Sequence, residues 1–294
     1  MKRRQFIGYS SLFLTGCSVS TVQSQSSESR QRPTQLRFAV TDLSGLDALS
    51  DAYEPFRAAL ENVIGLPITF YPVPNYSAAA PALLSNDLEL AFAGPSEYLW
   101  LRARAQAEPL VAISRKDYYS VAMVRADSEV KTLADLQGKT VAMRTEGSTA
   151  GHIFPMKLLI DAGLDPEEDF RVKMLDRDAF DALRRSEVDA WIDSYDRYAT
   201  YVEQAGLADK EIVMIAQGEP LPGDVLVANP SLGAKFIEEV RSQLLSQKET
   251  LLNALAASEA TAKYRESDML RASDIDYDGM RDIYRDIGQE SAIQ

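Results

Sequence analysis

The 294-residue sequence contains very few of the side chains that metal centres and catalytic triads use. It has one cysteine, Cys17, and one histidine, His152. A single cysteine excludes a disulfide within one chain, so the fold must be stabilised by its apolar core. We find no metal cluster, glycine-rich nucleotide loop or convincing triad, and therefore expect neither an enzyme nor a bound cofactor or metal. Chemistry based on carboxylates alone is the enzymatic alternative.

Positive charge is also scarce. The chain has 31 Lys and Arg against 44 Asp and Glu, a formal net charge of −13. Such a surface disfavours nucleic acid and anionic lipid as partners. It does not exclude a small anion, because local donors determine what a buried site binds. No apolar run reaches the roughly 20 residues that a membrane-spanning helix needs.

The first seventeen residues follow the order of an export signal. Basic residues 2–4 precede an apolar run over 6–14, and Leu-Thr-Gly-Cys follows at 14–17. This order resembles a bacterial lipoprotein signal peptide, cleaved after residue 16 with lipid on the Cys17 sulfur; residues 3–7 also resemble a twin-arginine signal. The alternative is a buried free cysteine. Removing the three basic residues changes the formal charge from −13 to −16.

Residues 17–34, rich in Ser, Gln and Arg, are predicted to form a disordered tether. The remainder is long enough for two modest domains. Strands alternate with helices along it, which predicts a mainly parallel sheet covered on both faces. We expect strands at 36–40, 68–73, 88–92, 119–124, 141–143, 170–175, 188–192, 211–215 and 225–228. We expect helices at 51–63, 76–84, from Ser96, at 132–136 and from Ser148 or Thr149, and a charged helical region from Ala234 onward.

Residues 140–155 form the stretch around which the rest is organised. A short buried strand ends in a turn at Gly147, and a helix is expected to begin at Ser148 or Thr149, both good N-cap residues. Free N–H groups and the helix dipole make such a turn suitable for an anion. His152 lies on the same first turn. An ordinary helix cap is the alternative interpretation.

Ligands in open α/β sheets bind beyond the carboxyl ends of strands. Four such ends are expected to share one cleft: Asp42, Gly94–Pro95, 146–149 and Asp193–Ser194. Asp193 follows an apolar strand directly, and a helix N-cap is the alternative for it.

A weak internal repeat has an offset of 100 residues. Ala82–Leu83, Leu88–Glu89 and Tyr98 correspond to Ala182–Leu183, Val188–Asp189 and Tyr198. In both copies a helix ends, a short strand follows, and a polar turn leads into a helix with tyrosine. The repeat favours two similar α/β lobes over one large sheet.

The order of several short motifs resembles the phosphate-, phosphite- and phosphonate-binding family of bacterial ABC-transporter solute-binding proteins. The motifs cover about residues 36–232: Ala91-Phe92-Ala93-Gly94-Pro95 with Tyr98, Tyr119-Ser120-Val121, residues 133–139 (LADLQGK), 147–152 (GSTAGH), 162–166 (AGLDP), Glu187-Val188-Asp189-Ala190 with Asp193-Ser194, and Leu221-Pro222-Gly223-Asp224.

The resemblance implies a two-lobed periplasmic binding protein fold of type II, with the lobes joined by a two-segment hinge. Lobe 1 would comprise residues 35–119 and 223–294, and lobe 2 residues 120–222. The implied partners are a small oxyanion, ABC permease subunits and the membrane through the lipid anchor. We expect an exported monomer that is periplasmic or on the cell surface.

The resemblance also implies the ligand-binding residues. They are Tyr76 and Tyr98 from lobe 1, and Ser148, Thr149, His152, Asp193 and Tyr195 from lobe 2. The family usually has a third hydroxyl where this chain has Ala150. Arg144 could replace that donor, or could be solvated or salt-bridged.

A tetrahedral oxyanion needs many hydrogen-bond donors, which hydroxyls, backbone N–H groups and a histidine supply. Asp193 would repel an anion that cannot donate a proton, so phosphate, phosphite and aminophosphonates fit and sulfate does not. The alternatives are another solute on the same fold, such as a sulfonate or a vitamin precursor, and a receptor that presents its ligand to a sensor.

Overall fold

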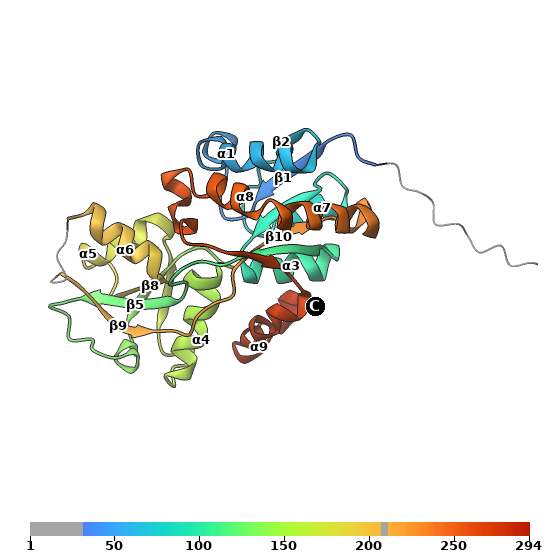
Figure 1. Ribbon diagram of the computed structural model, residues 1–294. Coiled ribbons are helices and arrows are strands. Elements are labelled where there is room, and N and C mark those ends of the chain that lie inside the picture. The colour runs from blue at the N-terminus through green and yellow to red at the C-terminus, as the bar shows by residue number, and fades with distance from the viewer. Residues whose placement is uncertain (1–31, 207–210) are drawn as a thin grey trace, which may run out of the picture. The chain divides into compact units, whose positions relative to one another are not determined.

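The computed structural model describes residues 32–206 and 211–294 (Figure 1). The predicted signal peptide, Cys17 and most of the tether lie outside these residues. The described chain forms two mixed sheets with helices on their faces, so the predicted two-lobed α/β fold is confirmed.

The first sheet has the strand order β11-β4-β10-β3-β1-β2. Its central strand β10 comes from late in the chain and lies between two strands from the first half. The bounds are β1 Leu36–Val40, β2 Ile68–Phe70, β3 Leu90–Ala93, β4 Glu108–Ile113, β10 Asp224–Ala228 and β11 Met269–Arg271, with helices α1 Leu46–Ile64, α2 Ala79–Leu84, α3 Pro95–Ala105, α7 Ala234–Ser246, α8 Lys248–Leu255 and α9 Asp278–Asp286.

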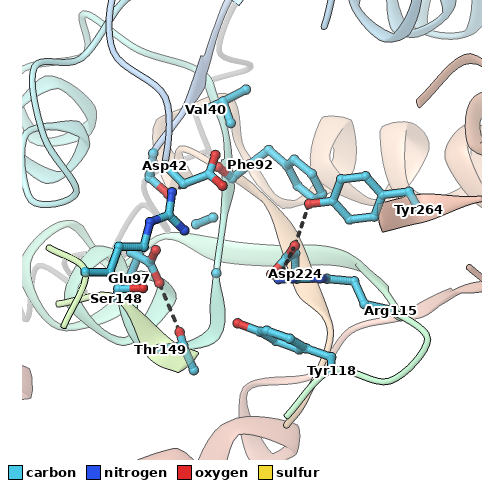
Figure 2. Close-up of a pocket in the computed structure, with 14 residues that line it drawn as sticks. Val40, Asp42, Phe92, Glu97, Arg115, Tyr118, Ser148, Thr149, Asp224 and Tyr264 are labelled. Atoms are coloured by element: carbon cyan, nitrogen blue, oxygen red, sulfur yellow. Dashed lines mark hydrogen bonds and ion pairs between the residues drawn. The ribbon is translucent and has the colours of Figure 1, made fainter. Parts of the chain in front are cut away.

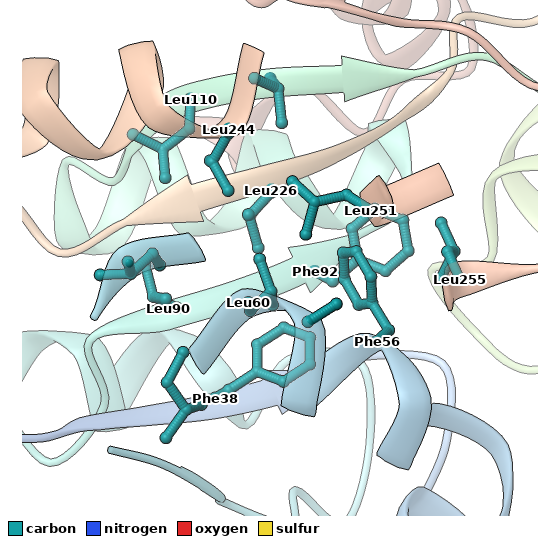
Figure 3. Packing of buried hydrophobic residues seen from close by; sticks show 14 of the residues in the cluster. Phe38, Phe56, Leu60, Leu90, Phe92, Leu110, Leu226, Leu244, Leu251 and Leu255 are labelled. Atoms are coloured by element: carbon teal, nitrogen blue, oxygen red, sulfur yellow. The ribbon is translucent and has the colours of Figure 1, made fainter. Parts of the chain in front are cut away.

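The two faces of this sheet form two separate cores because side chains alternate along each strand. Phe38 and Phe92 point to one face, where α1, α7 and α8 cover them. Figure 3 shows these rings among leucines from the same helices. Ala39 and Ala91 point to the other face, against α2, α3 and α9.

The second sheet has the order β7-β6-β8-β5-β9 and is formed by one continuous part of the chain. Its strands again carry one core on each face, one packed on α4 and the other on α5 and α6. The bounds are β5 Ser120–Arg125, β6 Thr140–Met143, β7 Arg171–Met174, β8 Ala190–Ser194 and β9 Ile212–Gln217, with helices α4 Phe154–Asp161, α5 Ala179–Arg184 and α6 Tyr195–Gln204.

The prediction of a mainly parallel sheet was wrong. Only β1–β2, β1–β3, β6–β7 and β6–β8 are parallel; β3–β10, β4–β10, β4–β11, β5–β8 and β5–β9 are antiparallel. The antiparallel pairs arise because β4, β5, β9, β10 and β11 are not linked to their neighbours by the crossover helices that parallel strands require.

Strands β4 and β11 were not predicted. Pro109 lies inside β4, and proline is unusual in a central strand because it lacks an N–H. The structure accommodates it at an irregularity, where Val227 pairs with Pro109, Leu226 pairs with Val111 and Leu110 is skipped. Strand β11 is a three-residue strand at the sheet edge.

Several predicted helix boundaries also differ. Helix α1 begins earlier, at Leu46, and α2 begins at Ala79. The predicted helix at 132–136 is a 3-10 turn, Leu133–Leu136, with the Thr132–Asp135 capping box that its sequence indicates.

The 100-residue repeat is present in the backbone. After α2 and α5, Asn86 and Ser186 adopt the left-handed conformation, with φ of 60° and 59°. Glu89 then accepts the N–H of Arg37 at 2.7 Å, and Asp189 accepts the N–H of Thr140 at 2.8 Å. Each carboxylate thus ties the start of its strand to the neighbouring strand, in the same way in both lobes.

Candidate functional site

A small cavity lies where strand ends of both sheets meet. Its volume is about 30 Å³, room for one or two water molecules. Asp42 follows β1, Gly94 follows β3 and Ser148 follows β6, so three of the four predicted strand ends contribute to it. The lining residues are Val40, Thr41, Asp42, Phe92, Ala93, Gly94, Glu97, Arg115, Tyr118, Arg144, Ser148, Thr149, Asp224 and Tyr264 (Figure 2).

The turn after β6 brings two predicted residues, Ser148 and Thr149, to this cavity. Gly147 has a φ of +88°, which few residues other than glycine adopt. Thr149 then begins a π-helical turn, Thr149–Ile153, instead of the α-helix that was predicted there, and α4 follows directly. The first N–H groups of such a turn have no partner within it, as the anion-binding interpretation requires.

The Thr149 hydroxyl also joins the two lobes. Thr149 Oγ1 accepts the N–H of Ser96 at 3.0 Å and lies 2.9 Å from Ser96 Oγ and 3.2 Å from Glu97 Oε2. The Ser96 hydroxyl in turn donates to the carbonyl of Gly147. The start of α3 in the first lobe is therefore bonded to the turn of the second.

His152 lies on the same turn but does not line the cavity. Its Nδ1 accepts the N–H of Gly147 at 3.0 Å. Burial lowers the pKa of the imidazole, so the ring is neutral near pH 7 and carries its hydrogen on Nε2. That hydrogen makes His152 a donor on the far side of the ring.

Asp193 is 1% exposed and faces the same turn. Its Oδ1 accepts the N–H of Ser194 at 2.7 Å and would lie 3.2 Å from a Cβ added to Gly151. Its Oδ2 is buried without a hydrogen-bond partner among the described residues, 3.5 Å from Nε of Arg197. Burial raises the pKa of Asp193, against the opposing effect of Arg197 and Arg144. Asp193 does not line the cavity, and its Oδ2 faces the guanidinium of Arg197.

The three predicted tyrosines lie apart from the cavity lining. Tyr76 lies near the guanidinium of Arg144, whose Cζ is 5.9 Å from its ring centroid. Tyr98 is fully buried in the first lobe and donates to Asp274 Oδ1 at 2.6 Å. Tyr195 stacks on Tyr119, with centroids 5.1 Å apart, where the chain passes into the second sheet. Tyr98 and Tyr195 thus have structural partners, and neither reaches the cavity.

Two arginines line the cavity. Arg115 was not predicted from the sequence, and Arg144 was predicted only as an alternative donor. Arg144 lines the cavity while its Nε binds Asp176 at 3.1 Å, so it is both salt-bridged and available to a ligand. Arg115 lies 2.7 Å from Asp196 and 3.6 Å from Asp224, and its guanidinium covers the ring of Tyr118.

Asp42 is a strongly stabilised anion beside the cavity. Burial alone would raise its pKa, but Lys263, 3.1 Å away, and Arg144 hold the pKa well below its usual range. Asp42 is therefore ionised at any physiological pH, and it fixes Lys263 beside the cavity. These charged groups are close to strand ends, and that position is the signal in the sequence that could have identified them.

Comparisons with known proteins identify the family of this chain. A model of the family described as "ABC transporter, phosphonate, periplasmic substrate-binding protein" matches residues 39–277. The phosphate-import protein PhnD of Mycolicibacterium smegmatis is 24% identical over 309 residues, which cover 95% of this chain and 94% of that protein.

Solved structures show the same fold. PhnD1 from Prochlorococcus marinus, in complex with methylphosphonate, has a TM-score of 0.69 at 18% identity, covering 88% of this chain and 100% of the other. XAC2383 from Xanthomonas citri, bound to ATP, has a TM-score of 0.74 at 14% identity, covering 88% and 98%. At these identities the likeness concerns the fold, and the ligand must be argued from the site.

Proposed function

Because the chain belongs to the periplasmic substrate-binding proteins of phosphonate ABC transporters, we propose that it captures a phosphorus oxyanion, namely a phosphonate, phosphite or phosphate, in the cavity between its lobes. The observation that carries the proposal is the convergence of donors from both lobes on one small buried space. Ser148 and Thr149 supply hydroxyls there, and Arg144 and Arg115 supply buried guanidinium groups. Such groups bind tetrahedral oxyanions strongly when water is excluded.

Within this proposal, Ser148, Thr149 and Arg144 contact the anion. Asp193 accepts a hydrogen from it through Oδ2, which has the Arg197 ion pair but no hydrogen-bond partner among the described residues, and His152 donates through Nε2. Tyr76 positions Arg144. We leave Tyr98 and Tyr195 out of the ligand shell, because their nearest partners are Asp274 and Tyr119.

The lobe boundaries remain part of the proposal: residues 35–119 with 223–294, and residues 120–222. The chain then passes between lobes near Tyr119 and again near Gly223. Adding a Cβ to Gly223 would overlap the carbonyl of Ile113, so the second passage lies against the end of β4. A glycine at this position permits that close approach.

Export and anchoring are proposed from the N-terminal sequence. Cleavage after residue 16 would leave Cys17 as the lipid site and residues 17–34 as a tether. None of the helices in the described ranges 32–206 and 211–294 is long and apolar enough to cross a membrane. We further propose that the protein acts as a monomer without catalysis and delivers its ligand to permease subunits.

A thermal-shift panel tests the ligand class. It should include phosphate, phosphite, methylphosphonate, aminoethylphosphonate, sulfate and an alkanesulfonate. A ligand present at 100 times its dissociation constant stabilises a fold by about 2.7 kcal/mol, which for a chain of this size raises the melting temperature by about 5 °C or more.

Two serine variants make the panel specific to the cavity. Ser148→Ala should lose the shift given by the true ligand, whereas Ser246→Ala, at the exposed end of α7, should keep it. A shift with the sulfonate and with none of the phosphorus ligands would replace the proposal by sulfonate binding.

A further inference from the structure

Three carboxyl groups line the cavity, and one of them differs from the other two. Asp42 has Lys263 at 3.1 Å, and Asp224 has Arg115 at 3.6 Å and the hydroxyl of Tyr264. Glu97 has no lysine or arginine nitrogen within 4.0 Å anywhere in the part of the chain that the structure describes. A cavity expected to attract anions thus contains one unpaired acid.

The position of Glu97 is fixed from both lobes. It lies in the first turn of α3 and is 3% exposed. Its Oε2 lies 3.0 Å from Ser96 Oγ, whose hydrogen goes to the Gly147 carbonyl, and accepts from Thr149 Oγ1 at 3.2 Å. Figure 2 shows Glu97 between Asp42 and Thr149. A Cβ on Gly94 would lie 2.5 Å from Oε2, so the carboxyl group rests directly on that glycine.

A buried carboxyl group without a cation favours its neutral form, because ionisation in a low-dielectric site is costly. Burial, with added repulsion from Asp224 and Asp42, raises the pKa of Glu97 to about 7. Its own backbone N–H and the Ser96 hydroxyl oppose this only in part. The other titratable or charged groups that face Glu97 or share its cavity are Tyr76 before α2, Tyr118 before β5, Tyr284 on α9, Arg115 after β4 and Arg144 after β6.

A neutral carboxyl group has one O–H donor, which an ionised one lacks. Oε2 accepts from the Thr149 hydroxyl, so we place the hydrogen on Oε1. Ala150 has no hydroxyl to offer as a donor. A hydrogen on Glu97 would add a hydrogen-bond donor to the cavity, which Glu97 and Thr149 both line. A bound anion, in turn, would be repelled by an ionised Glu97.

We propose that Glu97 is a specificity-determining residue that binds one proton from solvent when the oxyanion binds, and donates that hydrogen to a ligand oxygen. This inference rests on the proposed function. It distinguishes Glu97 from Asp193, whose Oδ2 has no hydrogen-bond partner among the described residues and is proposed to accept a hydrogen that the ligand itself supplies. The cavity would then select oxyanions that can both accept and donate a hydrogen bond.

The test compares the wild type with Glu97→Gln, which keeps the size and offers a permanent amide donor. Titration calorimetry with methylphosphonate and with phosphate, in two buffers of different ionisation enthalpy, gives the number of protons taken up. We expect Glu97→Gln to take up fewer protons than the wild type. Above pH 7 the ratio of wild-type to variant dissociation constants should rise about tenfold per pH unit, the slope for one linked proton.

Glu129→Gln is the control, because it removes a negative charge from an exposed residue outside the cavity lining and should leave both quantities unchanged. An equal proton number and a constant ratio in Glu97→Gln would overturn the inference while leaving anion binding intact. If neither probe nor phosphite binds the wild type, the proposed function fails instead.

A measurement without ligand keeps the inference testable in that case. The infrared spectrum at pH 6 should contain the carbonyl band of a buried protonated carboxyl that Glu97→Gln lacks. Identical spectra would show that Glu97 is ionised, and the inference would then be wrong.

Discussion

The indole of Trp100 lies directly against the backbone of Gly147, so that a Cβ added to this glycine would overlap the ring. Trp100 belongs to α3 of the first lobe, and Gly147 to the turn that carries Ser148 and Thr149. The contact lies beside the Ser96–Thr149 bonds, so the two lobes meet here through packing as well as hydrogen bonds. The two lobes can therefore approach each other this closely only because residue 147 has no side chain.

Gly147→Ala is predicted to hold the lobes apart. Gly163→Ala is the matched control, because Gly163 has a similar φ of +86° and open space where the Cβ would be. Both variants should lose about 1 to 2 kcal/mol of stability through backbone strain. Only Gly147→Ala should also bind the confirmed ligand at least tenfold more weakly and show a larger radius of gyration in scattering at saturation. Equal affinities of the two variants would contradict this.

Asp193→Asn is predicted to relax ligand discrimination. The amide can donate, so repulsion of an anion without a proton disappears, and sulfate binding should become measurable. The native ligand should bind about tenfold more weakly or worse, because a charged hydrogen bond is worth roughly 1.5 to 3 kcal/mol. Ser148→Ala should instead weaken every anion alike. Titration calorimetry decides, and Asp193 would be only a helix cap if the variant still excludes sulfate and keeps its native affinity.

Arg144→Gln is predicted to weaken ligand binding by about tenfold to a hundredfold, the cost of one charge-assisted hydrogen bond. The fold should be little affected, since the released Asp176 is well exposed. Arg125→Gln removes a comparable ion pair with Asp127, far from the cavity lining, and should bind normally. Unchanged affinity in Arg144→Gln would assign Arg144 to the salt bridge alone.

Glu97 is predicted to make the ligand-free fold less stable as pH rises. Its pKa is raised on folding from 4.5 to about 7, so its contribution is fully present below pH 4.5 and is lost as pH rises toward and through 7. The shift corresponds to about 3 kcal/mol. Urea unfolding at pH 4.5 and 8 should show this loss in the wild type relative to Glu97→Gln. Parallel pH profiles of the two proteins would contradict it.

Cys17→Ser is predicted to release the protein from membranes, because serine has no sulfur to which the lipid could be attached. Fractionation of cells expressing each form is the measurement, with Ser18→Ala as the neighbouring control. The variant protein should move to the soluble fraction. If it stays with the membrane, the lipoprotein interpretation is wrong.

The positions of the strand ends could be predicted from the sequence because they depend on local signals. A short apolar run followed by Gly94–Pro95, or by Gly147–Ser148, identifies a buried strand and the turn after it. The turn that brings Ser148 and Thr149 to the cavity was predicted in this way. Reliance on local signals also explains why β4 was not predicted. Proline is disfavoured in strands, and no local signal around Pro109 indicates that β4 lies inside the sheet.

The charge network could not be predicted, because its partners are far apart in the sequence. Lys263 pairs with Asp42 across 221 residues, and Tyr98 with Asp274 across 176. Nothing near Tyr98 in the sequence indicates that its hydroxyl has a partner in the C-terminal helical region. The family resemblance placed it at the ligand instead.

The place of β10 in the first sheet determines the order in which the protein can be completed. Strand β10 pairs with both β3 and β4, yet all five strands of the second sheet precede it in the chain. During synthesis the second sheet has its full set of strands before the first one does, although the first was begun earlier. The lobe encoded first is therefore finished last, and its half of the site remains open until residue 228 and the helices after it have emerged.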